Sequence, residues 1–380
     1  MSGNKALRVV VVLTLAMCLF CMPAVASTID WRQAEGETIA LLLNKHTYTD
    51  SLVPHLNEFT QLTGIKVEPY VLSEQQFWEK QRIVLSTHSD EYDITMMGPL
   101  TVWEYVDFLE PLNKYMEDPK LTDTKAWDKD DFFKGLMESN SLNGNQYAIP
   151  VMSEVYMLQY RKDLFDKFGL KIPKSTEEYV ETARTLSQKL KEAGMDNIDA
   201  VAVRGIRSPG MVSVGYSNIF YSYGAKDFDE NGKFVANSPE GIKATQLYMD
   251  LIKVGASKDW SSYDWYDVKD ALTSGRAAMA HDCNFFAAEQ WDPEISNVVG
   301  KMAYAKVPTG PVSDVSTTWT WGLSLNGASR HKKASWLFIQ WATSKEKLLN
   351  ASVNYNNFDP TRGSVWDDPK VVEMFEGMGN

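Results

Sequence analysis

Two tryptophans, two positions apart, are the first residues of this sequence whose spacing could serve chemistry. Trp319 and Trp321 stand in TTWTWGLSLN, residues 317–326. If this stretch is a strand, both indoles project from the same face. Such a pair is either a piece of the core or a flat platform on which a ligand stacks. The flanking threonines favour the edge of a polar cleft.

Carboxylates offer a second kind of chemistry. Glu154 and Asp282 could form the acid pair of a glycoside hydrolase, because the two acids of such an enzyme need only meet in space. The sequence contains no G-x-S-x-G elbow, no P-loop and no G-x-G-x-x-G. Hydrolase, NTPase and dinucleotide-binding functions therefore lack their usual motifs.

Metal-binding patterns are incomplete. DFDENGKFVANS (227–238) begins like a calcium loop, but Ser238 stands where a bidentate Glu is required. Its Asn231-Gly232 pair predicts a hairpin turn instead. The HDC stretch at 281–283 would point its neighbouring side chains to opposite faces of a strand, so it cannot gather around one ion. We therefore expect neither a metal nor a cofactor.

The N-terminal residues predict export. Lys5 and Arg8 precede a short apolar run, and AVA at 24–26 is a small-x-small cleavage site. We expect a signal peptide over 1–26, cleaved near Ala26, and a periplasmic protein. A lipid anchor on a cysteine near the end of the apolar run is the alternative.

Net charge limits the possible binding partners, and cysteine content limits the possible disulfides. Removing Lys5 and Arg8 takes the formal charge from −12 to −14, and an acidic chain repels nucleic acid and anionic lipid. Cys283 is the only cysteine after cleavage, so no intramolecular disulfide can form. The core alone must hold a mature chain of about 350 residues, which by size divides into two domains.

The elements that would position these residues form two α/β blocks. In the first, strands at 38–44, 65–72 and 92–98 alternate with helices at 51–64 and 77–85. This order predicts an open parallel sheet covered on both faces by helices.

The pattern then restarts. The predicted elements of the second block are a helix at 175–194 with a Ser175/Glu178 capping box, a strand at 200–205, a helix at 238–255, strands at 275–282 and 301–308, and a helix at 332–344.

Four stretches together resemble one family. They lie at 147–183, 271–282, 317–346 and 358–369, and over 36–380 the chain resembles family-1 extracellular solute-binding proteins. The resemblance implies an α/β fold of two lobes, each an open sheet flanked by helices, with a ligand cleft between lobes joined by hinge strands. It places the first lobe at 36–153 and 283–345 and the second at 154–282 and 346–380. Relatives continue further, so we expect the C-terminal part of the second lobe to be missing.

The resemblance also implies a function. A periplasmic receptor, expected to be a monomer, would capture a neutral sugar, polyol or oligosaccharide and deliver it to the permease of an ABC importer by hinge closure, without chemistry. Two alternatives stay open. Arg204 and Arg207 favour an anionic solute such as a phosphorylated sugar, and the acid pair favours a secreted glycoside hydrolase.

The cleft residues follow from the same resemblance. Open α/β sheets bind ligands beyond the carboxyl ends of their strands, and a sugar needs flat apolar faces together with acids, amides or arginine. Arg204 could equally be a structural ion pair, and Glu154 a hinge residue. The predicted ligand-binding residues are Asn44, His46, Glu74, Gln75, Gly98, Pro99, Glu154, Tyr156, Arg204, Asp282, Trp319 and Trp321.

Overall fold

The computed structural model describes residues 29–208, 210–314, 316–357 and 359–377. The predicted signal peptide and its cleavage site lie outside these residues. One mixed sheet of seven strands runs through the described chain in the order β2-β1-β3-β9-β6-β7, and β8 pairs with β6. Its strands are β1 (Thr38–Asn44), β2 (Lys66–Leu72), β3 (Ile94–Met97), β6 (Ala148–Arg161), β7 (Met279–Cys283), β8 (Met302–Ala305) and β9 (Thr318–Leu325).

The first lobe is built on β1, which pairs in parallel with β2 and β3 as the sequence predicts. Gly64 ends the second helix in a left-handed conformation (φ 72°), which glycine adopts without strain. The helices around this lobe are α1 (Thr47–Leu52), α2 (Leu56–Thr63), α3 (Glu74–Ser86), α4 (Pro99–Glu104), α5 (Asn113–Met116), α6 (Thr124–Trp127), α7 (Lys134–Ser139), α14 (Lys332–Ala342), α15 (Lys345–Tyr355), α16 (Gly363–Trp366) and α17 (Pro369–Gly377). A two-stranded ribbon, β4 (Ser141–Leu142) with β5 (Asn145–Gln146), precedes β6.

The second lobe has its own core. Ser175 is the N-cap of α9 (Thr176–Glu192), because its hydroxyl accepts a hydrogen bond from the Glu178 amide. Tyr179 and Leu186 of this helix are buried, as predicted. The hairpin turn is confirmed, because Phe228 bridges Phe234 across it. The helices are α8 (Lys162–Phe168), α9 (Thr176–Glu192), α10 (Ser213–Ser222), α11 (Pro239–Gly255), α12 (Trp265–Thr273) and α13 (Phe286–Trp291).

One predicted strand is wrong. Residues 200–205 form no extended strand; Val201 and Ala202 make only isolated bridges, to Ala256 and Ala280. Their apolar side chains are buried in the core, so the sequence has the apolar pattern of a strand although the backbone lacks the continuous hydrogen-bond ladder of one. None of the described helices is long and apolar enough to cross a membrane.

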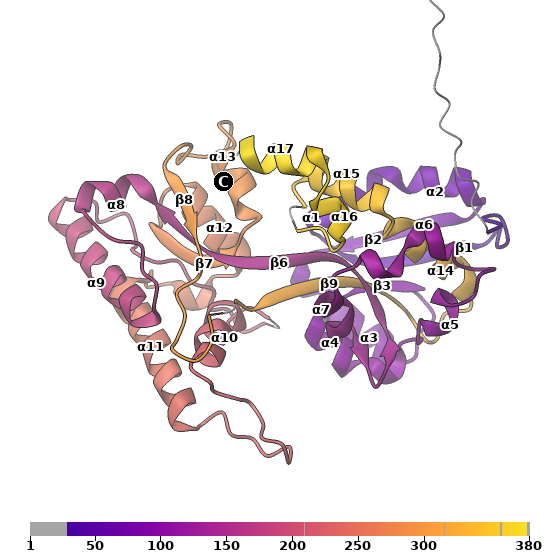
Figure 1. Ribbon diagram of the computed structural model, residues 1–380, viewed down its shortest axis with the longest axis horizontal. Coiled ribbons are helices and arrows are strands. Elements are labelled where there is room, and N and C mark those ends of the chain that lie inside the picture. The colour runs from indigo at the N-terminus through magenta and orange to yellow at the C-terminus, as the bar shows by residue number, and fades with distance from the viewer. Residues whose placement is uncertain (1–28, 209, 315, 358, 378–380) are drawn as a thin grey trace, which may run out of the picture.

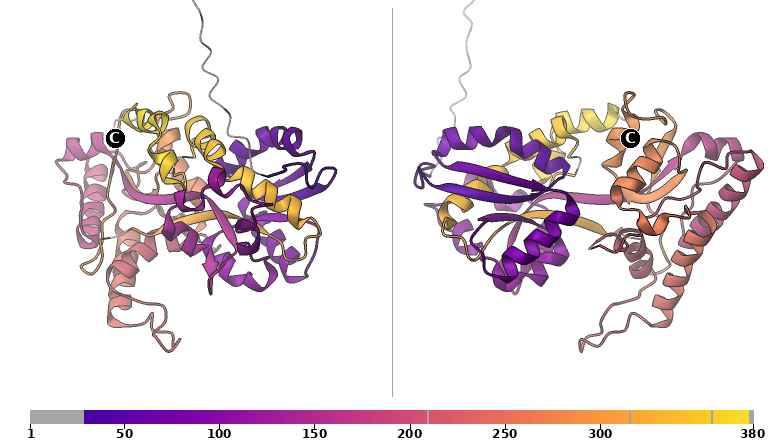
Figure 2. Two further views of the ribbon diagram at one scale, coloured as in Figure 1. Left: turned by 45° about the vertical axis from the view of Figure 1, so that its right-hand side comes forward. Right: turned by 180° about the vertical axis from the view of Figure 1, so that it is seen from behind.

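Strand β6 connects the two lobes (Figures 1 and 2). Its first half, 148–155, pairs with β9 in the first lobe, and its second half, 156–161, pairs with β7 and β8 in the second. Residues 153–156 therefore lie where the lobes meet. Any side chain at this crossing can contact residues of both lobes.

The observed contacts favour a different division from the one that the sequence suggested. Strand β8 pairs with the second half of β6, whereas α15 packs on α1 of the first lobe. Arg362 bonds the Trp127 and Thr343 carbonyls, also in the first lobe. We propose that the first lobe comprises 29–153 and 318–377 and the second 156–305.

Asp359 links three segments at the crossing. Its carbonyl accepts from the Ser153 amide (3.1 Å), and its carboxylate accepts from Asn284 Nδ2 (2.7 Å). The Asn284 amide in turn donates to the Val155 carbonyl (2.9 Å). Burial raises the pKa of Asp359 to about 7, against the lowering effect of the Asn284 hydrogen bond.

This carboxyl gives the first testable prediction. The folded protein keeps a proton on Asp359 up to a pH near 7, whereas the unfolded chain loses it near pH 4, so Asp359 stabilises the fold less as pH rises through this window. Asp359→Asn has no proton to lose. We expect its melting temperature, relative to the parent, to be higher at pH 8 than at pH 5. An equal difference at both pH values would contradict the prediction.

Candidate functional site

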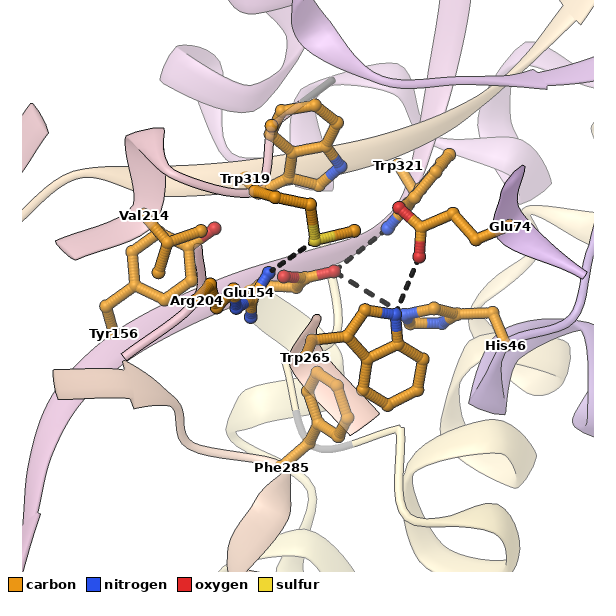
Figure 3. A pocket seen from close by; sticks show the side chains of 12 residues that line it. His46, Glu74, Glu154, Tyr156, Arg204, Val214, Trp265, Phe285, Trp319 and Trp321 are labelled. Carbon is orange, nitrogen blue, oxygen red and sulfur yellow. Dashed lines mark hydrogen bonds and ion pairs between the residues drawn. The ribbon is translucent and has the colours of Figure 1, made fainter. Parts of the chain in front are cut away.

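A cavity lies where the lobes meet. Its walls come from the segment after β1 and from α3 of the first lobe, from residues 204 and 210–211, α10, α12 and the segment after β7 of the second, and from β6 and β9. Figure 3 shows Trp321 and His46 directed at the Glu154 carboxylate, and Trp265 directed at Glu74. The lining residues are His46, Glu74, Glu154, Tyr156, Arg204, Gly210, Met211, Val214, Trp265, Phe285, Trp319 and Trp321.

Glu154 is the hydrogen-bonding centre of the cavity. Its Oε1 accepts from Trp321 Nε1 (2.9 Å) and lies 3.4 Å from His46 Nε2, and its Oε2 accepts from Cys283 Sγ (2.9 Å). Burial alone would raise the pKa of Glu154, but the His46 hydrogen bond and the nearby charges of His46 and Arg204 hold that pKa below its usual value. The cavity therefore contains an ionised acceptor at neutral pH.

Arg204 brings the positive charge to the cavity and is held by Asp282. Its Nε donates to Asp282 Oδ2 (2.9 Å), and its Nη2 donates to Oδ1, in a bidentate pair. Burial opposes the charge on Arg204, but Asp282 beside it raises the pKa of the guanidinium well above its usual value. Asp282 itself does not line the cavity.

The two tryptophans of β9 point to the same side, as predicted, and both line the cavity. Trp321 also belongs to the core: it is 2% exposed and stacks on Trp78 with ring centroids 5.3 Å apart. Trp319 is less enclosed, at 9%, and its Nε1 has no hydrogen-bond partner among the described residues. Trp321 is therefore mainly a core residue, whereas the indole N–H of Trp319 is available to donate a hydrogen bond to a ligand.

A hydrogen bond crosses the cleft directly. Trp265 Nε1 of the second lobe donates to Glu74 Oε2 of the first (2.6 Å). Tyr266 stacks on Trp265 and donates to the Lys45 carbonyl (3.4 Å). Burial raises the pKa of Glu74, as does the charge of Glu154, while the bond from Trp265 opposes this rise. These contacts hold the lobes together around the cavity.

The structure gathers seven of the twelve predicted site residues around this cavity. They are His46, Glu74, Glu154, Tyr156, Arg204, Trp319 and Trp321.

The other five lie elsewhere. Asn44 is buried at the end of β1, Gln75 is exposed, and Pro99 begins α4. Gly98 touches the site only through Trp319, because a Cβ there would lie 2.4 Å from the Trp319 ring. Asp282 does not line the cavity but accepts a hydrogen bond from Arg204, which does.

Five lining residues were not among the predicted ones: Gly210, Met211, Val214, Trp265 and Phe285. Trp265 begins α12 just after its Asp264 N-cap, and its place beside a predicted loop was the available signal. The others have no motif, because the packing of α10 and of the segment after β7 brings them to the cavity.

Two α/β lobes that share crossing strands and enclose a cavity of acids, an arginine and indoles define a solute-binding protein. The chain belongs to the family of bacterial extracellular solute-binding proteins, whose profile matches residues 45–347. It is 30% identical over 354 residues to the erythritol/L-threitol-binding protein of Mycolicibacterium smegmatis, covering 89% of this chain and 73% of that protein.

Solved structures agree with this membership. A solute-binding protein of Agrobacterium radiobacter in complex with ribitol is 25% identical, with a TM-score of 0.79 over 91% of this chain and 85% of that one. A solute-binding protein of Agrobacterium vitis with bound D-mannitol is 27% identical, with a TM-score of 0.76 over 89% and 81%.

These similarities confirm the predicted family and the two-lobe fold. The family and these relatives are binding proteins, so the chain is a solute receptor and not an enzyme. The glycosidase alternative finds no support, and Asp282 is already paired with Arg204 instead of facing Glu154 across the cavity.

Proposed function

We propose that the protein captures a small neutral polyol, or a sugar of similar size, in the periplasm and delivers it to the permease of an ABC importer. One observation carries the proposal: a cavity where the two lobes meet, lined by the two indoles of Trp319 and Trp321 and by ionisable groups. Small-molecule sites are typically apolar with a few oriented polar groups.

The chemistry of the lining fits a polyol. A hydroxyl both donates and accepts, so it can bond the Glu154 carboxylate and a guanidinium or indole N–H at once. The C–H faces of the same chain can pack on aromatic rings. Trp319 Nε1 has no protein partner among the described residues, and we propose that it donates to a ligand hydroxyl.

The charges around the cavity favour a neutral ligand over an anion. The ionised Glu154 carboxylate lines the cavity, whereas the guanidinium of Arg204 already makes a bidentate pair with Asp282. An anionic solute would face uncompensated repulsion in a desolvated site. Among the relatives, the printed ligands erythritol, L-threitol, ribitol and D-mannitol are all acyclic polyols, which supports the same choice.

Capture would proceed by hinge closure about the crossing at 153–156. Ligand bound between the lobes touches both only when they are closed, so binding selects the closed form. The cross-cleft bond from Trp265 to Glu74 belongs to this closed arrangement. We propose that the monomer presents the closed lobes to the permease.

The second prediction tests the ligand class by unfolding. Erythritol, ribitol or D-mannitol at 100 times its dissociation constant should stabilise the protein by about 2.7 kcal/mol. Calorimetric titration should give a saturable one-to-one isotherm. Because polyols also stabilise proteins by exclusion from the surface, glycerol at equal concentration and the Glu154→Gln variant are the controls. A shift of equal size in both controls, or tighter binding of mannitol 1-phosphate, would contradict the proposal.

A further inference from the structure

A second, smaller cavity lies behind Arg204, inside the second lobe. It shares Arg204 with the ligand cavity, and the Arg204–Asp282 pair contributes to its wall. The rest of the wall comes from α9, α10, α11 and β7. The lining residues are Tyr179, Val203, Arg204, Gly215, Ile219, Tyr248, Leu251, His281 and Asp282. His281 and Asp282 are neighbours on β7, where the sequence predicts side chains on opposite faces, but the structure places both in the wall of this cavity.

Two polar atoms in this wall have no hydrogen-bond partner among the described residues: Tyr179 Oη and His281 Nε2. Both side chains are buried, at 2% and 8% exposed. An unpaired buried polar atom costs about 1–3 kcal/mol, so native structures seldom keep two around one cavity. Each such atom needs a partner that is not a protein side chain.

We infer that this cavity binds one internal water molecule, which bonds Tyr179 and His281 and completes the shell of Asp282. The cavity has room for about one water. Dry cavities are lined by apolar groups alone, whereas this one combines a phenol, an imidazole and a carboxylate. Tyr179 and His281 thereby become positioning residues for Arg204, acting through the water and Asp282.

The protonation states suit three hydrogen bonds to one water. Burial lowers the pKa of His281 to about 4, against the charge of Asp282, so the ring is neutral at pH 7 and its Nε2 can donate or accept. Burial raises the pKa of Tyr179 far above its usual value, so its hydroxyl keeps its proton. Asp282 Oδ2 accepts only from Arg204 Nε among the described hydrogen bonds and can take one more donor.

We expect the water to affect binding because it holds Asp282, and Asp282 in turn orients the Arg204 guanidinium that lines the ligand cavity. This step rests on the proposed function, in which Arg204 contacts a ligand hydroxyl. Without the water, Asp282 loses one bond, and Arg204 is held less firmly. We expect Tyr179→Phe and His281→Phe each to weaken polyol binding by about three- to tenfold, the range of one net hydrogen bond.

A double variant distinguishes two explanations of the lost affinity: loss of one shared water, or two independent packing defects. If both residues act through one water, Tyr179→Phe/His281→Phe should weaken binding no more than the stronger single variant. Losses that multiply would overturn the inference. The matched control is Tyr160→Phe, which removes a hydroxyl from the same lobe's core but outside this cavity, and should leave affinity unchanged.

A second measurement does not depend on any ligand. Oxygen-17 relaxation dispersion counts long-lived internal waters, and the parent should contain one more than Tyr179→Phe and the same number as Tyr160→Phe. A crystal structure should show the water within hydrogen-bond distance of Tyr179 and Asp282. Equal counts for parent and Tyr179→Phe would overturn the inference. Failure of the parent to bind polyols would overturn the proposed function instead, and leave this count intact.

Discussion

Replacing Asp282 by alanine is expected to lower the free energy of unfolding by about 3–5 kcal/mol and to abolish ligand binding. The change leaves the Arg204 guanidinium, 8% exposed, without its bidentate partner. Removing one member of a buried ion pair costs this much because the remaining charge cannot be resolvated. The Cys283 amide, which donates to Asp282 Oδ1 (2.7 Å), also loses its acceptor. Urea unfolding followed by circular dichroism measures the loss.

Two control variants test the cause. In Asp282→Leu/Arg204→Met both charges of this pair are gone, so most of the lost stability should return while binding stays absent. Asp314→Ala breaks the exposed pair with Lys306 and should change stability little. If the double variant is no more stable than Asp282→Ala, packing and not charge explains the loss.

Trp321→Ala is expected to destabilise the protein by about 3–5 kcal/mol, the usual cost of deleting a buried tryptophan. Its ring stacks on Trp78 and packs edge-on against Phe77, and its Nε1 is a donor to Glu154. The same change removes a donor from the buried Glu154 carboxylate. Thermal and urea unfolding of the variant should both show the loss.

Trp319→Ala is the comparison on the same strand. Its indole Nε1 has no partner among the described residues, and its ring lines the cavity. We therefore expect a loss of affinity of about 1–3 kcal/mol, on the scale of a buried aromatic contact, with a smaller loss of stability than in Trp321→Ala. Dissociation constants are measured well below each melting temperature. If both variants melt low and bind polyol normally, the pair is core and not a platform.

Local signals in the sequence predicted most elements. The Ser175 cap, the left-handed Gly64 and the alternating blocks correspond to α9, α2 and the parallel β1–β3 core. The strand expected at 200–205 failed because an apolar run indicates burial and does not reveal whether a neighbouring strand is available for pairing.

The site was predictable only where a general rule applied. The family resemblance led to His46 and Glu74, in agreement with the rule that ligands lie beyond strand ends, and the spacing of two tryptophans led to Trp319 and Trp321. No local pattern shows that Arg204 pairs with Asp282, 78 residues away, or that Phe285 reaches the cavity. These features arise from tertiary packing.

The order of strands has a consequence for how the protein is made. Strand β9 lies between β3 and β6 in the first lobe, yet among the described residues it is the last strand in sequence. Translation from residue 155 to residue 325 takes about 10 to 30 seconds at bacterial rates. During that time β3 and β6 each present an open edge, which is prone to pair with other chains. The first lobe therefore cannot finish folding before the second has been synthesised.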